Sequence, residues 1–405
     1  MRILMIADYL PYPAVMGTQV RTYNVLRRMA AKHDVWLACL GQSPDDTDAV
    51  KHLKGFCQGV ETDRAAARPA LAHVPGLLRF AVAGKPLELK FYYSARLASQ
   101  VRSWAGQVGF DVVHIENSHM AQYLDALPPG QGFRSLTFID IVYVKYQRLA
   151  QQELGLFKRL RQSLYADTMK RWEPQYAGRF DVCFTMSEVD RRMLLAANPR
   201  LRLEVSPNGV DTRSIQSLPE DPVATPAVLF VGNMAYAPSV DAVRFFCRDV
   251  LPKVRITAGP VEFWIVGPNP SAEVRALEGD GVHVTGRVAD VTPFYRRATV
   301  AVAPIRAGGG TRIKVLEAMA FGRPVVSTSI GSEGLEAQGG VHLLAADDAE
   351  SFARQTSALL LDKGQRQRVA RSARRLVEEK YDWDPIVERM LRTYEESTCR
   401  SGAEG

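Results

Sequence analysis

Short, nearly continuous apolar runs alternate with longer segments of helical spacing along the first half of the chain. The apolar runs are rich in β-branched or aromatic residues and end in polar turns, at residues 2–8, 35–40, 111–116, 136–140 and 181–187. Apolar residues on both sides of a strand are typical of parallel strands that helices cover on both faces. The segments between them, such as residues 18–32, have the spacing of amphipathic helices.

The same alternation starts again in the second half of the chain. Predicted strands lie at residues 227–233, 262–267, 282–286, 299–305 and 324–328, and a predicted helix lies at 239–251. The turn-rich segment 206–226 separates the halves and reads as a linker. Two successive β–α alternations predict two doubly wound α/β domains. The tail is helical from about residue 347, and its amphipathic end at 383–397 needs a surface on which to pack.

Composition agrees with this picture and excludes several classes of protein. A chain of 405 residues is too long for one ordinary core. No apolar run has the length of a membrane span, and the N-terminus reads as a buried strand, so we expect a cytoplasmic protein. The five cysteines are scattered, which predicts buried free thiols rather than disulfides or a zinc site. A net charge of +7 is compatible with phosphate-bearing ligands or anionic lipids.

The most informative stretch is "PIRAGGGTRIKVLEAMAFGRPVVST", residues 304–328. It places Gly308, Gly309 and Gly310 directly before a predicted helix from Thr311 to Phe321, with Gly322 in the C′ position. A helix N-terminus with free N–H groups favours an anion, and glycine permits close approach. Basic residues near that helix end oppose its dipole, a conflict that a bound diphosphate would remove. These basic residues are Arg306, Arg312 and Lys314.

Glu317 lies three residues after Lys314, on the same face of the predicted helix. A carboxylate there can accept hydrogen bonds from the two hydroxyl groups of a ribose. The alternative is a flexible loop followed by a solvated Lys–Glu pair. The glycines are not followed by the Gly-Lys-Ser/Thr of a Walker A loop, and no strand precedes a GxGxxG, which disfavours a nicotinamide dinucleotide site.

Strand ends in the first half supply further candidates. Gly17 begins the first long helix and would admit a phosphate, or it is simply part of a turn. His119 follows the strand at 111–116 and could titrate near an active site, or it is packed. Asp140 ends the strand at 136–140 as a reactive carboxylate or a helix cap.

Segment 145–171 interleaves basic and apolar residues. Such a helix can lie on an anionic membrane, or its basic face is solvated while it packs on its own domain. No recognised nucleic-acid-binding motif accompanies the charge, so nucleic acid is not expected.

The 304–328 stretch, together with "VSPNGVD" (205–211), "FVGNM" (230–234) and "VTGRVADV" (284–291), resembles glycosyltransferase family 4, of the bacterial exopolysaccharide or surface-glycan type. The resemblance implies retaining enzymes with an α/β GT-B fold, in which two facing Rossmann-like, doubly wound domains enclose an interdomain cleft. It implies an acceptor-binding domain at 1–207, a nucleotide-sugar-binding domain at 208–378, and a helix at 379–405 that returns to the first domain.

The resemblance also implies roles for single residues. Glu317 matches the family's ribose-binding glutamate, Gly17 the glycine loop near the donor phosphate, and Gly286, Arg287 and Val288 the stretch whose backbone contacts the base.

Three positions depart from the family pattern. Gly309 stands where the family usually has a first glutamate, which contacts the donor sugar. No lysine follows the first strand of the second domain, so we expect Arg306 and Lys314, with Arg312, to bind the diphosphate. The usual histidine before Asp140 is Ile139.

The predicted function is transfer of a sugar from a nucleotide-diphosphate donor, such as a UDP or GDP sugar, to a glycan or lipid-linked acceptor in bacterial polysaccharide or glycoconjugate synthesis. The expected catalytic residues are Arg306 and Lys314, with Asp140 and His119 contacting acceptor or sugar. No cofactor and no metal is predicted, and peripheral contact with an anionic membrane is expected through 145–171. The alternatives are a GT-B nucleotide-sugar epimerase and a sugar-nucleotide-binding protein without transfer activity.

Overall fold

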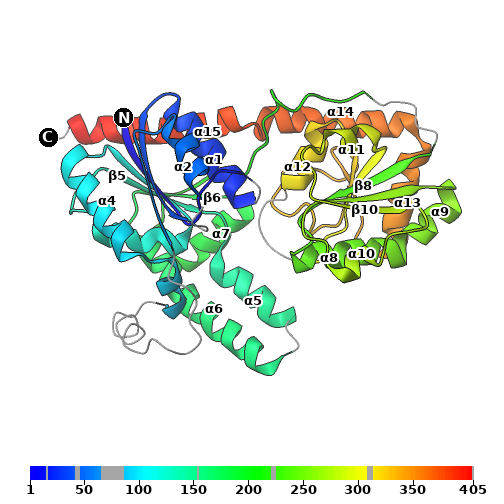
Figure 1. Ribbon diagram of the computed structural model, residues 1–405, viewed down its shortest axis with the longest axis horizontal. Coiled ribbons are helices and arrows are strands. Elements are labelled where there is room, and N and C mark those ends of the chain that lie inside the picture. The colour runs from blue at the N-terminus through cyan, green and yellow to red at the C-terminus, as the bar shows by residue number, and fades with distance from the viewer. Residues whose placement is uncertain are drawn as a thin grey trace. The chain divides into compact units, whose positions relative to one another are not determined.

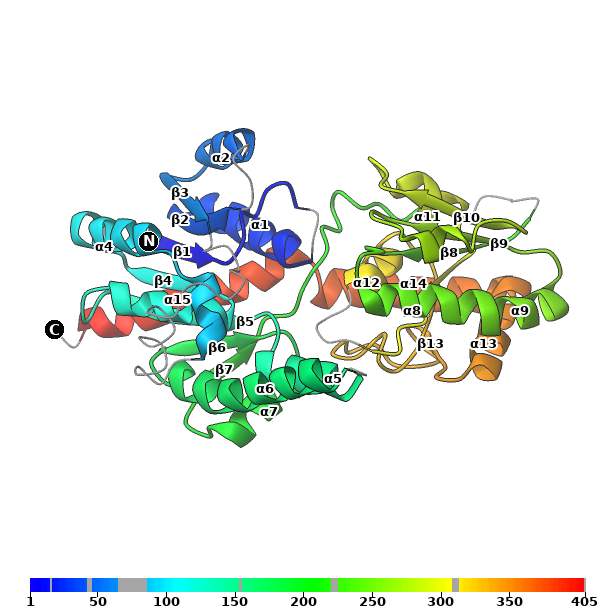
Figure 2. The ribbon, with the colours of Figure 1, turned by 60° about the horizontal axis from the view of Figure 1, so that its bottom comes forward.

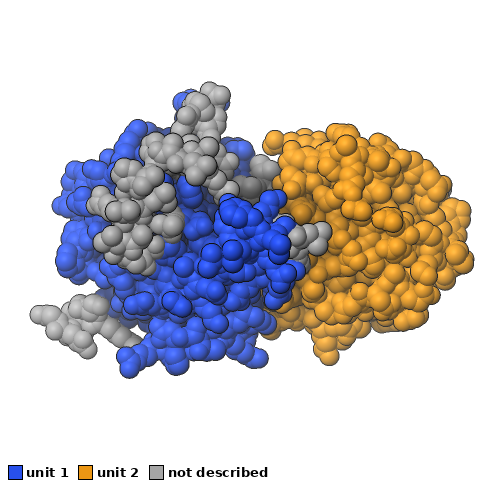
Figure 3. All heavy atoms as spheres, turned by 90° about the horizontal axis from the view of Figure 1, so that it is seen from below, with its two compact units in different colours: residues 1–207, 383–405 blue, residues 208–382 orange. Residues whose placement is uncertain are grey.

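The computed structural model describes residues 1–14, 17–41, 46–64, 86–152, 155–219, 225–307 and 313–403. The chain divides into two compact units, which Figure 3 colours separately. Unit 1 combines residues 1–207 with residues 383–405, and unit 2 consists of residues 208–382. Unit 1 is therefore built from two segments that are far apart in the sequence.

Unit 1 contains a parallel sheet with the strand order β3-β2-β1-β4-β5-β6-β7. The strands are β1 Arg2–Ala7, β2 Asp34–Gly41, β3 Gly59–Arg64, β4 Val112–Glu116, β5 Phe133–Phe138, β6 Val182–Thr185 and β7 Leu203–Val205. The order reverses at β1 and β4, which pair with each other through Ile3 beside Val112. Ligands of open parallel sheets bind outside the carboxyl ends of strands at such a reversal.

Helices cover both faces of this sheet (Figure 1). They are α1 Gly17–Ala30, α2 Thr47–Lys54, η1 Leu87–Tyr92, α4 Ala95–Val108, η2 Ser118–Ala126, α5 Val142–Gln152, α6 Leu156–Ala177, α7 Glu188–Ala197 and α15 Trp383–Ala403. Alternate residues of β1 enter two different core clusters because successive side chains of a strand point to opposite faces. Leu4 and Ile6 pack with residues of α4 and α6, whereas Ile3 and Met5 pack with residues of α1, α2 and α15.

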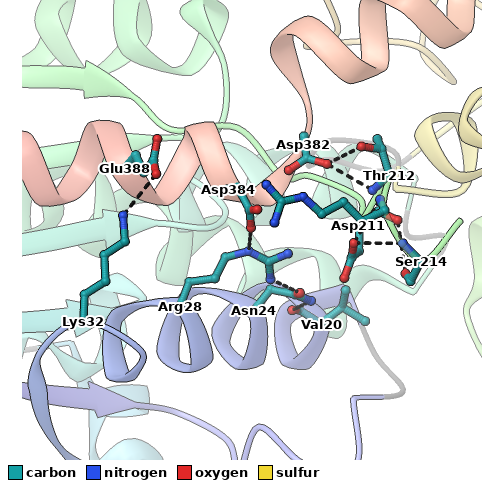
Figure 4. A network of polar contacts seen from close by, with 11 residues as sticks. Val20, Asn24, Arg28, Lys32, Asp211, Thr212, Ser214, Asp382, Asp384 and Glu388 are labelled. Carbon is teal, nitrogen blue, oxygen red and sulfur yellow. Dashed lines mark hydrogen bonds and ion pairs between the residues drawn. The ribbon is translucent and has the colours of Figure 1, made fainter.

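The last helix, α15, completes the core of unit 1. Trp383, Ile386 and Met390 are each about 1% exposed in the cluster that contains Ile3 and Met5. Ion pairs join the polar side of the contact between α1 and α15, as Figure 4 shows. Arg28 Nε lies 2.5 Å from an Asp384 carboxylate oxygen, and Lys32 Nζ lies 3.1 Å from one of Glu388.

Unit 2 contains a second parallel sheet with the order β10-β9-β8-β11-β12-β13. Its strands are β8 Ala227–Val231, β9 Glu262–Val266, β10 Val282–Gly286, β11 Val300–Ala303, β12 Val325–Ser327 and β13 Leu344–Ala345. Here the order reverses at β8 and β11, where Val300 pairs with Val228.

The helices of unit 2 also form two layers, visible in Figures 1 and 2. They are α8 Ala237–Phe245, the π-helical turn η3 Phe246–Val250, α9 Leu251–Ala258, α10 Ala272–Arg275, α11 Thr292–Arg297, α12 Ile313–Ala320, α13 Ala349–Leu361 and α14 Lys363–Lys380. Helices α8, α9 and α13 pack with one face of the sheet, and α11, α12 and most of the buried residues of α14 pack with the other.

Segment 206–226, predicted to be a linker, is packed against unit 2 over part of its described residues. Val210 is 5% exposed, and its N–H donates to the Tyr381 carbonyl at 2.8 Å. Thr212 donates hydrogen bonds to the Asp382 carboxylate, also drawn in Figure 4. Residues 208–219 therefore belong to the packing of unit 2, although their composition is that of a turn.

Among the described residues, no helix is long and apolar enough to cross a membrane. Cys39, Cys57 and Cys183 are free and buried, as predicted. The prediction is wrong for Cys399, which is exposed, and Cys247 is intermediate.

Candidate functional site

The carboxyl ends of β8 and β9 bring two glycine residues of unit 2 into close contact. A Cβ atom built on Gly267 would lie 1.9 Å from the Gly232 carbonyl oxygen, which excludes any larger residue. A Cβ atom on Gly232 would lie 2.9 Å from Lys314 Nζ. Since Gly232 directly follows β8, Lys314 lies at the point where the strand order reverses.

Lys314 lies in the first turn of α12, which spans Ile313–Ala320. Its Nζ also lies 4.5 Å from the centre of the Phe230 ring, a cation–π distance. The Phe230 ring and the small Gly232 therefore place the ammonium group near the end of β8. An anion at this strand end would therefore meet a positioned positive charge.

The far end of α12 is closed by the predicted glycine. Gly322 has φ +72°, and its N–H donates to the Met319 carbonyl at 3.0 Å, while Arg323 N donates to Ala318 O at 2.9 Å. This is the Schellman arrangement, which satisfies the last carbonyls of a helix. It fixes the length of α12 and hence the position of its first turn.

Glu317 lies one turn after Lys314 and is half-buried. The Tyr295 hydroxyl of α11 donates to Glu317 Oε2 at 2.9 Å. Burial raises the pKa of the Glu317 carboxyl, whereas Tyr295 and the nearby Lys314 oppose that rise. Tyr295 holds one oxygen of Glu317, which fixes the orientation in which the other oxygen can accept a hydrogen bond.

Arg306 follows β11 and is exposed. Its guanidinium group makes a two-pronged contact with Asp241 of α8, with Nε 3.0 Å and Nη2 2.5 Å from the two carboxylate oxygens. The hydrogen bond to Asp241 raises the pKa of Arg306. A phosphate would have to compete with Asp241 for this group, which was not apparent from the sequence.

The other predicted donor-site residues of unit 2 fall into two groups. Gly286 ends β10 with φ +73°, Arg287 is exposed, and Val288 packs beside the core of the α12 layer. The predicted loop residues Gly308, Gly309, Gly310, Thr311 and Arg312 lie outside the described residues.

In unit 1, Gly17 is the first residue of α1, as predicted, and is exposed. Asp140 lies just after β5 and forms an ion pair with Lys145 of α5 at 3.0 Å. The carboxylate therefore lies at the predicted sheet edge, but a basic residue partly neutralises it.

His119 is buried and both of its ring nitrogens have partners. Nδ1 lies 3.1 Å from Asn117 Oδ1, and Nε2 lies 3.1 Å from the Tyr165 hydroxyl. The ring stacks on Tyr92 with centroids 4.1 Å apart. Burial lowers the pKa of His119 to about 3. A neutral, fully bonded imidazole is a poor proton carrier near neutral pH, so this arrangement favours a positioning role.

Two residues at this edge were not among the predicted site residues. Asp8 follows β1, and Asn117 follows β4 with a left-handed backbone, φ +76°. Asn117 Nδ2 donates to Asp8 Oδ2 at 2.8 Å. Burial raises the pKa of Asp8 to about 7. The sequence signal was present, because Asp8 ends the first apolar run just as Asp140 ends a later one.

A buried charge network lies beneath the edge of unit 1. Arg21 of α1 and Glu116 of β4 are fully buried, with Arg21 Nε 3.5 Å from a Glu116 oxygen. The Arg21 charge lowers the pKa of Glu116 against the effect of burial. Arg21 also donates to the carbonyls of Ser206 and Pro207, each at 3.0 Å. The network therefore fixes the end of the first segment of unit 1.

No group of three or more potential metal-ligating side chains is found among the residues described. The sequence does contain two Asp-x-Asp triplets, at 46–48 and 382–384. In the second, Asp382 accepts hydrogen bonds from Thr212 and Asp384 pairs with Arg28. These carboxylates are thus engaged in packing contacts.

Comparison with known proteins matches both halves of the chain to glycosyltransferase families. Residues 15–214 match the model described as Glycosyltransferase Family 4, and residues 225–362 match the model of glycosyl transferases group 1. Together with two doubly wound parallel units, these matches define a glycosyltransferase of the GT-B fold. The first half of the chain matches family 4 itself, and the second half matches the group 1 transferases.

Relatives and solved structures agree with this assignment. A phosphatidyl-myo-inositol mannosyltransferase of Mycobacterium leprae is 27% identical over 76% of this chain and 79% of its own length. An uncharacterized 44.6 kDa protein in the cps region of Klebsiella pneumoniae is 22% identical over 94% of this chain and 96% of its own.

Two solved structures share the fold along nearly the whole chain. A sucrose-phosphate synthase of Thermosynechococcus elongatus has a TM-score of 0.73 at 18% identity, covering 99% of this chain and 100% of its own. Anabaena Alr3699/HepE in complex with UDP and glucose has a TM-score of 0.66 at 16% identity, covering 98% and 100%.

Proposed function

We propose that this glycosyltransferase uses a nucleotide-diphosphate sugar and transfers the sugar with retention of anomeric configuration. The observation that carries the proposal is the placement of Lys314 over glycine-lined backbone at the strand reversal of unit 2, with Glu317 one turn further along α12. A diphosphate needs a positive charge and close backbone approach, and a ribose needs a hydrogen-bond acceptor nearby.

The reaction breaks the bond between the anomeric carbon and the β-phosphate oxygen, and it forms a bond from that carbon to an acceptor oxygen. Negative charge develops on the departing nucleoside diphosphate, and positioned cations stabilise such charge most strongly when it appears in the transition state. Lys314 supplies this charge, and Arg306 does so after exchanging Asp241 for phosphate. The departing phosphate accepts the acceptor proton, so the proposal requires neither a protein base nor a metal.

Glu317 binds the ribose in this proposal. The Tyr295 hydroxyl occupies Oε2, so the remaining oxygen is available to the ribose hydroxyls. The backbone of Gly286, Arg287 and Val288 contacts the nucleotide base in this proposal. Their place at the end of β10 supports this role. Asp140, with the newly identified Asp8 and Asn117, contacts the acceptor or the transferred sugar from unit 1.

The proposed acceptor is a lipid-linked or growing glycan in bacterial surface-polysaccharide or glycoconjugate synthesis. Two relatives support this class of acceptor. One is named for mannosyl transfer to a phosphatidyl-myo-inositol lipid, and the other is encoded in a cps region. The identities of 27% and 22% support a class of acceptor rather than one compound.

Calorimetric titration with UDP and GDP tests the donor site. Replacing Lys314 by Ala should weaken binding of the preferred nucleotide by roughly 10- to 100-fold, the cost of one charge-assisted hydrogen bond. Lys253→Ala is the matched control, because Lys253 is in the same unit and pairs with Glu350 at the surface. Equal affinity in wild type and Lys314→Ala would refute the diphosphate assignment.

Measuring turnover of the nucleotide sugar with and without an acceptor tests the two alternative functions, an epimerase and a binding protein without transfer activity. Consumption of the nucleotide sugar without any acceptor would indicate an epimerase, and tight binding without transfer to any native acceptor would indicate a binding protein.

We further propose that unit 1 docks peripherally on an anionic membrane through α5 and α6. These helices pack against each other and project from the body of unit 1 (Figures 1 and 2). Leu156, Phe157, Leu160 and Leu164 are 83%, 81%, 59% and 58% exposed. Apolar side chains at this spacing share one side of α6, and exposed Lys158, Arg159 and Arg161 lie among them.

Co-sedimentation with vesicles of phosphatidylglycerol and phosphatidylcholine tests this docking. Phe157→Ser/Leu160→Ser and Lys158→Gln/Arg159→Gln/Arg161→Gln should each reduce the bound fraction several-fold, because both burial of apolar area and attraction to anionic lipid contribute. Ile256→Ser, at an 86% exposed position of unit 2, and Lys51→Gln/Lys54→Gln on α2 are the controls. Unchanged vesicle binding in both α6 variants would exclude this surface as the membrane-binding site.

A further inference from the structure

Unit 2 has a basic pocket of about 460 Å³ at a place that the proposed donor site does not use. Thr299 and Pro324 line it, and they directly precede β11 and β12. The pocket therefore lies at the amino ends of these strands, whereas Lys314 lies at the carboxyl end of β8. Its volume is within the range of small-molecule sites.

The pocket is lined by a concentration of guanidinium groups. They belong to Arg323, Arg366, Arg371, Arg374 and Arg375. Among the described residues that line the pocket, the carboxylate is that of Glu378, which pairs with Arg374 Nε at 2.6 Å. The lining thus has a clear excess of positive charge. We refer to it as the arginine pocket.

Backbone carbonyls fix three of these arginines. Arg323 Nε donates to Tyr295 O at 2.7 Å, Arg366 Nη1 to Leu359 O at 2.9 Å, and Arg374 Nη2 to Thr212 O at 3.0 Å. A carbonyl orients a guanidinium group without neutralising its charge. The fold therefore holds positive charge in place around the pocket, and Arg323 is only 2% exposed.

Arg371 and Arg375 are the two groups open to a ligand. They lie four residues apart on α14, so they share one side of the helix, and both are exposed. Arg371 makes one long contact, 3.3 Å, to Gln367. Arg375 makes no side-chain hydrogen bond or ion pair with another described residue. Two guanidinium forks one turn apart can each bind two oxygens of a phosphate.

The charge of α14 as a whole points the same way. Its 18 residues include seven basic and two acidic ones, a net charge of +5, against +7 for the entire chain. Positive charge that is concentrated on one helix beside a pocket attracts anions over a distance.

We propose that the arginine pocket is a separate binding site for a small phosphate-bearing molecule, such as a sugar phosphate. Arg371 and Arg375 bind the phosphate group, and Ser217, Thr299 and Gln367 offer hydroxyl and amide groups to the remainder of the ligand. The same phosphate chemistry occurs in free metabolites and in lipid headgroups. This site goes beyond sugar transfer, because no step of that reaction involves it.

Calorimetric titration of the full chain with glucose 6-phosphate tests the free-metabolite form. Arg371→Gln/Arg375→Gln should weaken binding at least tenfold. Arg371→Lys/Arg375→Lys should recover part of the affinity, because it retains the charge but loses the bidentate geometry. Lys363→Gln/Arg368→Gln removes the same charge from residues of α14 that do not line the pocket, and should bind like wild type. Thermal unfolding of each variant checks that it is folded.

Lys314→Ala distinguishes this pocket from the donor site, and it should bind glucose 6-phosphate like wild type. Vesicles with phosphatidic acid test the lipid form with the same variants. Equal effects of the pocket and control pairs, loss of binding only in Lys314→Ala, or no binding of either probe by wild type would each overturn the proposal.

Discussion

Asp8 carries a carboxyl group that folding removes from water at the carboxyl end of β1. It is 4% exposed, and it accepts a hydrogen bond from the side chain of Asn117, which does not offset the loss of hydration. The pKa of Asp8 is therefore raised to about 7, from the usual 3.8. A carboxyl that titrates near neutral pH at the strand reversal is the kind of group found at functional sites.

The raised pKa makes the stability of unit 1 depend on pH. Between about pH 4 and pH 7 the unfolded chain releases a proton that folded Asp8 retains, so the free energy of unfolding falls as the pH rises. Asp8→Asn lacks this contribution. Its stability relative to wild type should improve by roughly 2–3 kcal/mol between about pH 5 and pH 8. Urea unfolding at the two pH values measures the difference. Glu173, whose pKa is also raised to about 7, is present in both proteins, so its contribution cancels in the comparison. A stability difference between Asp8→Asn and wild type that does not change with pH would contradict the prediction.

Single residues also show how far the sequence predicts the site. The spacing of Lys314 and Glu317 was readable, because residues three positions apart on a helix lie on the same side. Their partners Phe230 and Tyr295 were not, because they come from β8 and α11, and only the folded sheet brings them together. For the same reason, the sequence did not reveal that Asp241 pairs with Arg306.

Among the elements, the predicted strands of both halves are confirmed, and the central strands such as β1, β4 and β11 are buried on both faces. The missed strands β3, β7 and β13 have different compositions. β3 is the polar edge sequence GVETDR, β7 has three residues, and β13 has two. Edge strands and very short strands lack the continuous apolar run by which buried parallel strands are recognised.

A buried tyrosine hydroxyl of helix α15 makes polar contacts with the sheet. Tyr394 is fully buried, and its hydroxyl lies 3.0 Å from Ser135 Oγ and 2.9 Å from His114 Nδ1. Tyr394→Phe should lower the free energy of unfolding by about 0.5–1.5 kcal/mol, because it removes the hydroxyl's hydrogen bonds to two buried groups, which keep their own contact at 2.8 Å. Urea unfolding measures this. Tyr236→Phe, at a 45% exposed position, is the control, and equal stability of the two variants would show that the contact contributes nothing.

At the scale of the whole molecule, charge and apolar surface are distributed unevenly. Helix α14 carries much of the net positive charge, whereas the exposed apolar residues of α6 lie in unit 1. Composition alone gives the total of +7 and cannot show this separation. The proposed phosphate site on unit 2 and the proposed lipid-facing surface on unit 1 can therefore be tested separately, by variants that do not overlap.

The two-segment construction of unit 1 has a consequence for the order of folding during synthesis. A ribosome releases residues from the N-terminus onward, and domains generally fold as complete units. All of unit 2 emerges before Trp383, Ile386, Met390 and Tyr394, which fill the core around β1. Although unit 1 begins first, unit 2 is the first to have its whole sequence available. The apolar surface of β1, β2 and α1 therefore stays exposed until α15 has been synthesised. During that interval the nascent chain is most prone to aggregation and to binding by chaperones.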